Sequence, residues 1–496
     1  MMGSASTGIP GLDHILGGGL SRRRLFLIEG SPGSGKTTLA MQFLLEGAAR
    51  GERTLYITLS ETVDELEAVA RSHGWSLDGI ELFELANLDG ALGEGRDQTV
   101  LHPWEIELGE TVKLITDSVD RAGPSRVVFD SLSELRLLAQ DALRYRRQVL
   151  ALKQYFAAHD TTVLMVDDLT GERPDGHLHS LCHGVITVSR RTLDYGAIRR
   201  RLEVQKLRGV DFRAGWHDFQ IRTGGLVVYP RLVASDFHKP FVGEPVASGV
   251  AELDEMLDGG PSRGTCTLVT GPAGSGKTNL GMQYVAAACA RGERCAIYEF
   301  DERIGTLLAR ARDMGSDFEA YMKAGLLDVR QVDPAETSPG EFSSLVRNEV
   351  ENHRARIVMI DSLAGYMAAM AQEQHLQLQM HELLAYLNQQ GVVTLLINPQ
   401  QSLVGSMSTS GLNVSYMADA VLLLRYFEAD ARVRKAITVI KNRGGPHEDS
   451  IRELRIDRMG VRIGQALNGF KGVLTGVPKY VGETAPLMEA RGEDRR

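Results

Sequence analysis

The sequence predicts an α/β protein built from two tandem copies of one domain, each a mostly parallel sheet with flanking helices. The glycine-rich stretch GSPGSGKTTLA begins at Gly30, and GPAGSGKTNLG begins at Gly271, a separation of 241 residues (271 − 30). Glu61 and Glu302 keep the same separation (302 − 61), as do Leu12-Asp13 and Leu253-Asp254. A repeat of this length indicates that a whole domain has been duplicated.

Within each copy, short apolar runs alternate with segments of helical periodicity, which is the pattern of an α/β sheet. The runs 24–30 and 265–271 predict strands that end where the glycine loops begin, and residues 37–51 and 278–292 predict the helices that follow. Further strands are expected at 54–61 and 295–302, at the runs that end in Asp130 and Asp361, and at 161–168 and 391–399. The runs 184–191 and 420–427 open the predicted antiparallel hairpins that end each copy.

These patterns divide the chain into a first domain at 1–230, a linker at 231–246, a second domain at 247–480 and a polar tail at 481–496. Prolines and the absence of a helical period favour an extended linker. The mixed charge of the tail is typical of disorder. Asp130 and Asp361 are separated by only 231 residues (361 − 130), so the first copy is expected to carry an insertion within 87–99.

Composition limits the class of protein. The chain has 496 residues and a net charge of −9, which disfavours a surface built to hold nucleic acid. No window approaches the ~18 consecutive apolar residues that a membrane span requires, and the first residues do not resemble a signal peptide, so a cytoplasmic protein is expected. The four cysteines lack metal-ligand spacing and are expected to be buried thiols.

Both glycine loops match G-x-x-x-x-G-K-T and lie between a predicted strand and a predicted helix, which is the context of a phosphate-binding loop. Lys36 and Lys277 are expected to bind the β- and γ-phosphates of ATP, and Thr37 and Thr278 to place a hydroxyl on Mg²⁺. A chance glycine turn is the alternative. The predicted nucleotide-binding residues are Gly30, Ser31, Pro32, Gly33, Ser34, Gly35, Lys36, Thr37 and Thr38 in the first copy, and Gly271, Pro272, Ala273, Gly274, Ser275, Gly276, Lys277, Thr278 and Asn279 in the second.

Acidic residues follow the predicted strands at matched positions. Asp130 and Asp361 are expected to reach the water shell of the metal, although an aspartate at a strand end is also a common helix cap. Glu61 and Glu302 lie one strand after each loop, where a carboxylate can orient or deprotonate a nucleophile. A surface acid at a helix start is the alternative, since Thr62 and Glu65 form a possible capping box.

The tandem GxxGSGKT loops, the acidic residues after the second strand, the DSL strands and the Lys-x-Arg-Gly elements resemble the KaiC family of RecA-like ATPases from about Thr7 to Tyr480. The resemblance implies two RecA-like P-loop NTPase domains, a double-ring homohexamer with ATP between neighbouring subunits, and Kai-type or signalling proteins as partners. It implies ATP hydrolysis in the first half, and autokinase and autophosphatase activity in the second. The family has two consecutive glutamates where this chain has Ser60-Glu61 and Asp301-Glu302.

The same resemblance suggests roles for residues that spacing alone does not identify. Ser415 matches the serine of the family's phosphorylated serine-threonine pair, Tyr416 replaces the threonine, and Ser410 matches a nearby threonine. A hydroxyl-rich turn is the alternative. The basic residues of the two Lys-x-Arg-Gly elements resemble fingers that act on the neighbouring subunit's phosphate, against the alternative of a solvated hairpin. These residues are Lys206, Arg208, Lys441 and Arg443.

The leading hypothesis is an ATPase and serine/threonine autokinase that serves as a timing or signalling switch. A nucleic-acid-dependent motor of the RecA and DnaB kind is the second, and DNA-stimulated hydrolysis would favour it. An ATP-dependent scaffold without kinase activity is the third. Phosphate that appears on the protein itself would distinguish the autokinase from both.

Overall fold

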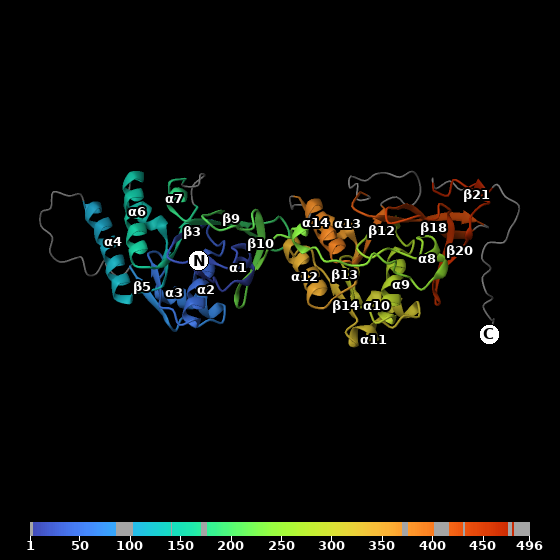
Figure 1. The fold of residues 1–496 in the computed structure, drawn as a ribbon, viewed down its shortest axis with the longest axis horizontal. Coiled ribbons are helices and arrows are strands. Elements are labelled where there is room, and N and C mark those ends of the chain that lie inside the picture. The colour runs from blue at the N-terminus through green and yellow to red at the C-terminus, as the bar shows by residue number, and fades with distance from the viewer. Residues whose placement is uncertain are drawn as a thin grey trace. The chain divides into compact units, whose positions relative to one another are not determined.

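The computed structural model describes residues 3–85, 103–139, 141–169, 176–369, 375–400, 416–429, 432–474 and 479–480. It divides the chain into two compact units, Met1–Arg231 and Leu232–Arg496, which are labelled by element in Figure 1. Each unit is described by itself.

The first unit begins with a small antiparallel pair and then alternates strands with helices. Its helices are α1 (Pro10–Ile15), α2 (Lys36–Ala49), α3 (Val63–Ser72), α4 (Pro103–Ala122), α5 (Leu132–Ala139), α6 (Ala142–Ala158) and α7 (Gly176–Leu181). Its strands are β1 (Ser4–Ala5), β2 (Leu20–Ser21), β3 (Leu25–Gly30), β4 (Thr54–Thr58), β5 (Ile80–Glu84), β6 (Arg126–Asp130), β7 (Thr162–Asp168), β8 (Gly184–Arg191), β9 (Arg199–Leu207), β10 (Trp216–Arg222) and β11 (Gly225–Tyr229).

The second unit repeats this order. Its helices are η2 (Ala234–Phe237, a 3₁₀ turn), α8 (Ala251–Glu255), α9 (Lys277–Ala290), α10 (Ile304–Asp313), α11 (Phe318–Lys323), α12 (Pro339–Glu351), α13 (Leu363–Ala369) and α14 (Leu376–Gln389). Its strands are β12 (Cys266–Pro272), β13 (Cys295–Glu299), β14 (Leu327–Gln331), β15 (Ile357–Asp361), β16 (Val393–Gln400), β17 (Ala420–Ala429), β18 (Arg432–Asn442), β19 (Arg452–Asp457), β20 (Gly460–Ala466), β21 (Phe470–Lys471) and β22 (Lys479–Tyr480).

Each unit is centred on a nine-stranded sheet, in the orders β11-β10-β9-β8-β3-β7-β6-β4-β5 and β14-β13-β15-β16-β12-β17-β18-β19-β20. Strands β8, β3, β7, β6, β4 and β5 pair in parallel, and β9, β10 and β11 continue the sheet in antiparallel fashion. The second unit has the same arrangement, with β17 antiparallel to β18. The predicted α/β class and the hairpin region that ends each copy are therefore confirmed.

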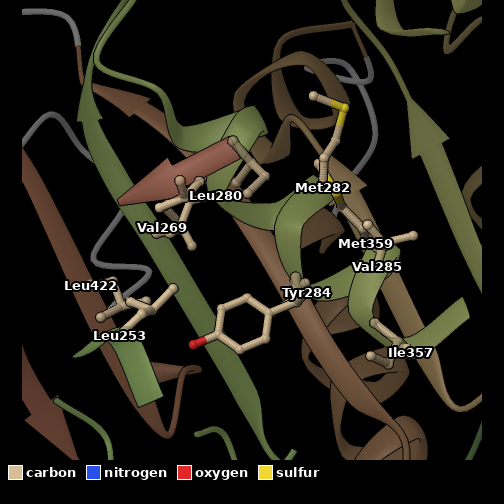
Figure 2. Packing of buried hydrophobic residues seen from close by; sticks show 14 of the residues in the cluster. Leu253, Val269, Leu280, Met282, Tyr284, Val285, Ile357, Met359 and Leu422 are labelled. Carbon is tan, nitrogen blue, oxygen red and sulfur yellow. The ribbon is translucent and has the colours of Figure 1, made fainter. Parts of the chain in front are cut away.

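Helices cover both faces of each sheet because the central strands are apolar on both sides. All of β3 and all of β12 are buried. In the second unit, one core packs α9 against the sheet and contains Leu280, Val285 and Met359 (Figure 2). A second core on the other face contains Phe342, Tyr366 and Leu383. The loop that each central strand feeds is thus held by a buried strand on one side and a packed helix on the other.

Residues 232–246 belong to the second unit. The turn η2 packs against α14, where the Phe237 ring meets the Tyr386 ring edge-on at 5.3 Å between centroids and lies under the guanidinium of Arg347. Val246 is buried in the core around α9. The segment that the sequence predicts as a linker therefore packs on the second unit over much of its length. No helix among the described residues is long and apolar enough to span a membrane.

A buried arginine joins three segments of the first unit. Arg126 is fully buried at the start of β6 and donates to the carbonyl oxygens of Ser6 (2.7 Å) and Phe43 (2.9 Å). Its Nε and Nη2 contact the carboxylate of Glu52 at 2.7 and 3.2 Å, and Arg22 contacts the same carboxylate at 2.7 Å. Hydrogen bonding to Arg126 lowers the pKa of Glu52 to about 2. Ile357 occupies the matching sheet position of the second unit.

We predict that Arg126→Ile, which installs the second unit's residue, destabilises the first unit by about 3 kcal/mol, because it leaves two carbonyl oxygens without their donor and the Glu52 carboxylate with only one of its two arginine contacts, that of Arg22. Chemical denaturation followed by tryptophan fluorescence tests this, since Trp75, Trp104 and Trp216 are all in the first half of the chain. The folded-state pKa of Glu52 is depressed, so the pair's contribution is complete above pH 4.5 and is lost as the pH falls toward about 2.

The difference in the free energy of unfolding between the wild type and Arg126→Ile should therefore shrink as the pH falls from 4.5 toward about 2. Arg22→Ala is the matched control, because Arg22 is 35% exposed and its loss should cost about 1 kcal/mol or less. Equal unfolding midpoints for the wild type and Arg126→Ile at neutral pH would contradict the prediction.

Candidate active site

The two glycine loops lie at matching places, between β3 and α2 and between β12 and α9. The Lys36 ammonium donates to the carbonyl oxygens of Gly30 and Ser31, both at 3.0 Å, and forms an ion pair with Asp168 at 2.6 Å. The Lys277 ammonium donates to the carbonyl oxygen of Pro272 at 2.8 Å. Each lysine is the first residue of its helix, and its ammonium group contacts carbonyl oxygens of the preceding glycine loop, where a phosphate-binding loop has its lysine.

The last glycine of each loop has a backbone that other residues rarely adopt. Gly35 has φ +107° and Gly276 has φ +103°, both in the left-handed region. A Cβ atom on Gly35 would lie 2.8 Å from Ile221, and one on Gly276 would lie 2.2 Å from Ile456. The backbone conformation therefore requires glycine here, and a Cβ atom would also force the neighbouring isoleucine side chain to shift. Helices α2 and α9 begin at the next residue.

A threonine hydroxyl and an aspartate carboxylate meet beside each loop. The Thr37 hydroxyl donates to Asp130 at 3.2 Å, and the Thr278 hydroxyl donates to Asp361 at 2.6 Å. Burial raises the pKa of Asp130, and burial raises that of Asp361 to about 6. In the first unit, the buried phenol of Tyr56 also donates to Asp130 at 2.6 Å.

The loops fit the phosphates of a nucleotide. The hydroxyls of Ser34 and Ser275 are buried, and neither has a hydrogen-bond partner within the protein. Such orphaned donors next to a lysine and a helix N-terminus suit phosphate oxygens. The threonine-aspartate pairs suit Mg²⁺, which is usually held by one or two protein groups, phosphates and water. The part of the chain that the structure describes contains no cluster of three or more His, Cys, Asp or Glu side chains that could hold a metal ion.

Glu61 lies between the end of β4 and the start of α3. Thr58 fixes its backbone, since the Thr58 hydroxyl donates to the Glu61 carbonyl at 2.7 Å and the Glu61 amide donates to that hydroxyl at 3.0 Å. Atom Oε2 of Glu61 is buried and has no hydrogen-bond partner among the residues that the structure describes. Desolvation, with the nearby charge of Asp130, raises the pKa of Glu61 to about 7. The predicted capping box is present at the next residue, where Thr62 and Glu65 exchange hydrogen bonds. The cap thus belongs to Thr62 and Glu65, and the carboxylate of Glu61 takes no part in it.

The corresponding acids of the second unit are held differently. The carboxylate of Glu302 forms an ion pair with Arg310 of α10, and that of Asp301 accepts from the Ser362 hydroxyl. Glu299, at the end of β13, is buried with one oxygen lacking a partner. Burial, with the charge of Asp361, raises the pKa of Glu299 to about 9.

The predicted finger residues lie at the opposite end of each sheet from their own loop. Lys206 pairs with Val185 next to Gly184, and Gly184 pairs with Phe26 near the start of β3. About four residues of strand, or roughly 13 Å, separate that point from Gly30. The Lys206 ammonium donates to the carbonyl oxygens of His179 and Cys182. Arg208 is exposed and donates to the Ser180 carbonyl at 3.0 Å.

The second unit repeats this placement. Lys441 pairs with Val421 near the start of β12, donates to the Ala418 carbonyl at 2.6 Å, and is followed by the exposed Arg443. Of the predicted phosphoacceptor segment, Ser410 and Ser415 lie outside the described residues. Tyr416 is described and is half exposed.

Sequence reasoning missed four residues of these sites: Tyr56, Asp168, Glu299 and Arg310. Asp168 ends β7, a strand next to β3, so its place at a strand end could have singled it out. The other three residues, Tyr56, Glu299 and Arg310, are not repeated at the equivalent positions of the other copy. Sequence reasoning looked for residues that the two copies share, and it therefore missed them.

Comparisons with known proteins agree with this geometry. A family model described as "ATPase: KaiC" matches residues 5–233 and again residues 246–468. The chain is 30% identical over 486 residues to a protein of Synechocystis sp. named "Circadian clock protein KaiC3", covering 96% of this chain and 95% of that protein. It is also similar to proteins named "Circadian clock oscillator protein KaiC", with 29% identity in Acaryochloris marina and 28% in Parathermosynechococcus lividus. These matches cover 96% of this chain and 91% and 88% of those proteins.

We predict that Asp168→Asn tightens ATP binding at the first loop about fivefold, because the Lys36 ammonium no longer has to leave a carboxylate worth ~1 kcal/mol and one negative charge beside the phosphates is removed. Titration with a fluorescent ATP analogue in a Lys277→Ala background isolates the first loop. Asp160→Asn is the matched control, because Asp160 is exposed and contacts Arg23. Unchanged or weaker binding in Asp168→Asn would show that the ion pair does not compete with nucleotide.

Proposed function

The chain belongs to the KaiC family of ATPases, and from that premise we propose that it hydrolyses ATP in stacked hexameric rings and phosphorylates itself on serine in its second domain. ATP binding and ATPase activity follow from membership of this family. The hexamer, the kinase activity and the identity of the phosphorylated serine are parts of the proposal. Its output is a timing or signalling switch read by partner proteins.

ATP binds at both glycine loops. Backbone N–H groups of each loop and the N-terminus of α2 or α9 hold the phosphates, and Lys36 or Lys277 turns toward the β- and γ-phosphates. Thr37 with Asp130, and Thr278 with Asp361, are the residues that would hold Mg²⁺. When bound, the ion would supply positive charge that stabilises the phosphates during transfer.

The environment of the Glu61 carboxylate is the observation that supports hydrolysis in the first domain most directly. An acceptor oxygen that is buried, unpartnered and close enough to Asp130 and Lys36 to feel both charges suits a general base for water. A pKa raised to about 7 places this group near the working pH, where general bases are most effective. Glu61 accepts a proton of the attacking water as the water oxygen bonds to the γ-phosphorus. The bond from the γ-phosphorus to the bridging oxygen breaks, and inorganic phosphate and ADP are released.

Assembly into rings explains the position of the finger residues. Lys206 and Arg208 lie far from their own loop, so they can meet a γ-phosphate only on another subunit. A head-to-tail contact that places the finger end of one sheet against the loop end of the next closes into a ring. Lys441 and Arg443 would serve the second ring in the same way.

The second domain carries the proposed kinase. A serine hydroxyl gives its proton to Glu302, its oxygen bonds to the γ-phosphorus, and the bond to the β–γ bridging oxygen breaks to release ADP. Ser415 is the proposed acceptor, with Ser410 as the alternative position. Asp301 supports the site through its contact with Ser362. The new phosphate adds roughly −1.5 to −2 charge at a subunit interface, which changes the partners that can bind.

We predict that Glu61→Gln and Arg208→Ala each abolish most first-domain turnover alone, and that mixing the two variants restores part of it. A shared site is intact wherever an unaltered Glu61 faces an unaltered Arg208, so random mixing should recover about a quarter of the wild-type rate. Phosphate release is measured in a Glu302→Gln background, which reduces the contribution of the second domain. Native mass spectrometry verifies that the rings are mixed.

Two results would count against this mechanism. Full turnover in homogeneous Glu61→Gln rings would move the base elsewhere. A failure to recover activity in rings that demonstrably contain both variants would mean that Arg208 does not complete the neighbour's site.

For the kinase, we predict one dominant phosphosite at Ser415 after incubation with Mg-ATP, absent in Ser415→Ala and in Glu302→Gln. Tyr416 should stay unmodified, because its hydroxyl lies several ångströms further from the backbone than that of a serine. Phosphopeptide mapping by mass spectrometry is the measurement. Labelling of Ser410 or Tyr416 in place of Ser415 would overturn the residue assignment. No labelling under conditions where ATP is hydrolysed would overturn the autokinase.

A further inference from the structure

The glutamates proposed as bases in the two domains differ in one contact. Atom Oε2 of Glu61 is buried without a hydrogen-bond partner, whereas the carboxylate of Glu302 is paired with the guanidinium of Arg310. Each glutamate lies two residues before a ten-residue helix, α3 or α10. The side chain that pairs with Glu302 comes from that helix.

Arg310 also reaches the helix that follows the second glycine loop. Its Nη1 donates to the amide oxygen of Asn279 at 3.4 Å, and Asn279 comes directly after Thr278 on α9. Leu307 and Ala311 are buried in the core and fix α10 against α9. One guanidinium thus connects the glutamate to the loop helix across the site.

The first domain cannot form this contact. Helices α3 and α10 are aligned by the repeat, 241 residues apart, so Val69 occupies the place of Arg310 and Thr38 that of Asn279 (310 − 69 and 279 − 38). Val69 packs against the first unit's core and has no polar atom in its side chain. Only the second copy therefore has a side chain at this position that can contact the glutamate.

We propose that Arg310 is a positioning residue that restrains Glu302 and thereby makes phosphoryl transfer in the second domain slower than in the first. The Glu302 carboxylate already accepts a hydrogen bond from the Arg310 guanidinium, and it must give up this charge-assisted contact before it can turn toward water or a hydroxyl. Arg310 is placed to act on the rate and not on ATP affinity, since its hydrogen bonds to described residues go to Glu302 and Asn279 and not to the loop lysine or the metal-side threonine.

This inference rests on the proposed function. Arg310→Val installs the first domain's residue, and it should raise the second-domain kcat about tenfold with KM for ATP unchanged, since a hydrogen bond to a charged group is lost. The full-length chain in a Glu61→Gln background, whose remaining turnover comes from the second domain, is the protein to assay. Arg310→Lys keeps the positive charge that offsets Glu299 and Asp361, and it should change kcat less than threefold.

A double-mutant cycle separates positioning from a general effect on α10. In the Glu302→Gln background, Arg310→Val should leave the residual rate unchanged, because the group that Arg310 restrains is gone. Arg310→Gln repeats the test with a polar side chain should the valine variant not fold. An unchanged or lower kcat in a folded Arg310 variant, or the same rise without Glu302, would overturn the inference. Absence of ATP turnover in the wild-type chain would instead overturn the proposed function.

Discussion

Both sites depend on the parallel register that brings the carboxyl ends of neighbouring strands to one edge of each sheet. In the first unit, Gly30 pairs with Asp168 and Thr58 pairs with Asp130. In the second unit, Glu299 pairs with Asp361 at the same edge. A slip of one residue in either strand would turn each aspartate to the other face of the sheet and away from the threonine it meets. The buried apolar strands fix this register, so packing in the cores determines where the aspartate and threonine side chains lie.

Within that shared frame the two copies have diverged in the groups that surround the common residues. The lysine, threonine, aspartate and glutamate recur at each loop, but Tyr56 faces Asp130 where the second copy has Ile297. Glu299 stands where the first copy has Thr58, so the second site contains an additional buried carboxyl group, and burial raises its pKa to about 9. The positive charge of Arg310 counteracts part of the rise in the pKa values of Glu299 and Asp361. The duplication has therefore kept the geometry of the glycine loops and changed the electrostatics around the neighbouring carboxyl groups.

The sequence predicted the parts of this structure that obey local rules. The loops, the strands that feed them, the helices that follow and the capping box of Thr62 and Glu65 all have signatures within a few residues, and the structure contains each of them. The pairing of Thr37 with Asp130 is expected from strand order, because both lie at the carboxyl edge. Contacts such as those of Asp168 with Lys36 or Arg310 with Glu302 depend on which side chains meet across strands and helices. No local pattern carries that information, and the roles proposed for Lys206, Arg208 and Ser415 rest on resemblance.

The ion pair between Asp168 and Lys36 gives the first loop an internal counter-ion. An ammonium group that is nearly buried and already neutralised is a poor trap for small anions such as inorganic phosphate or sulfate, which carry too little charge and too few contacts to displace the carboxylate. In the second loop Pro399 takes the register position of Asp168, and among the described residues Lys277 has one hydrogen-bond partner, the carbonyl oxygen of Pro272. The two loops thus differ in their tolerance of anionic metabolites, and the second is the more open to competition from the salts of its surroundings.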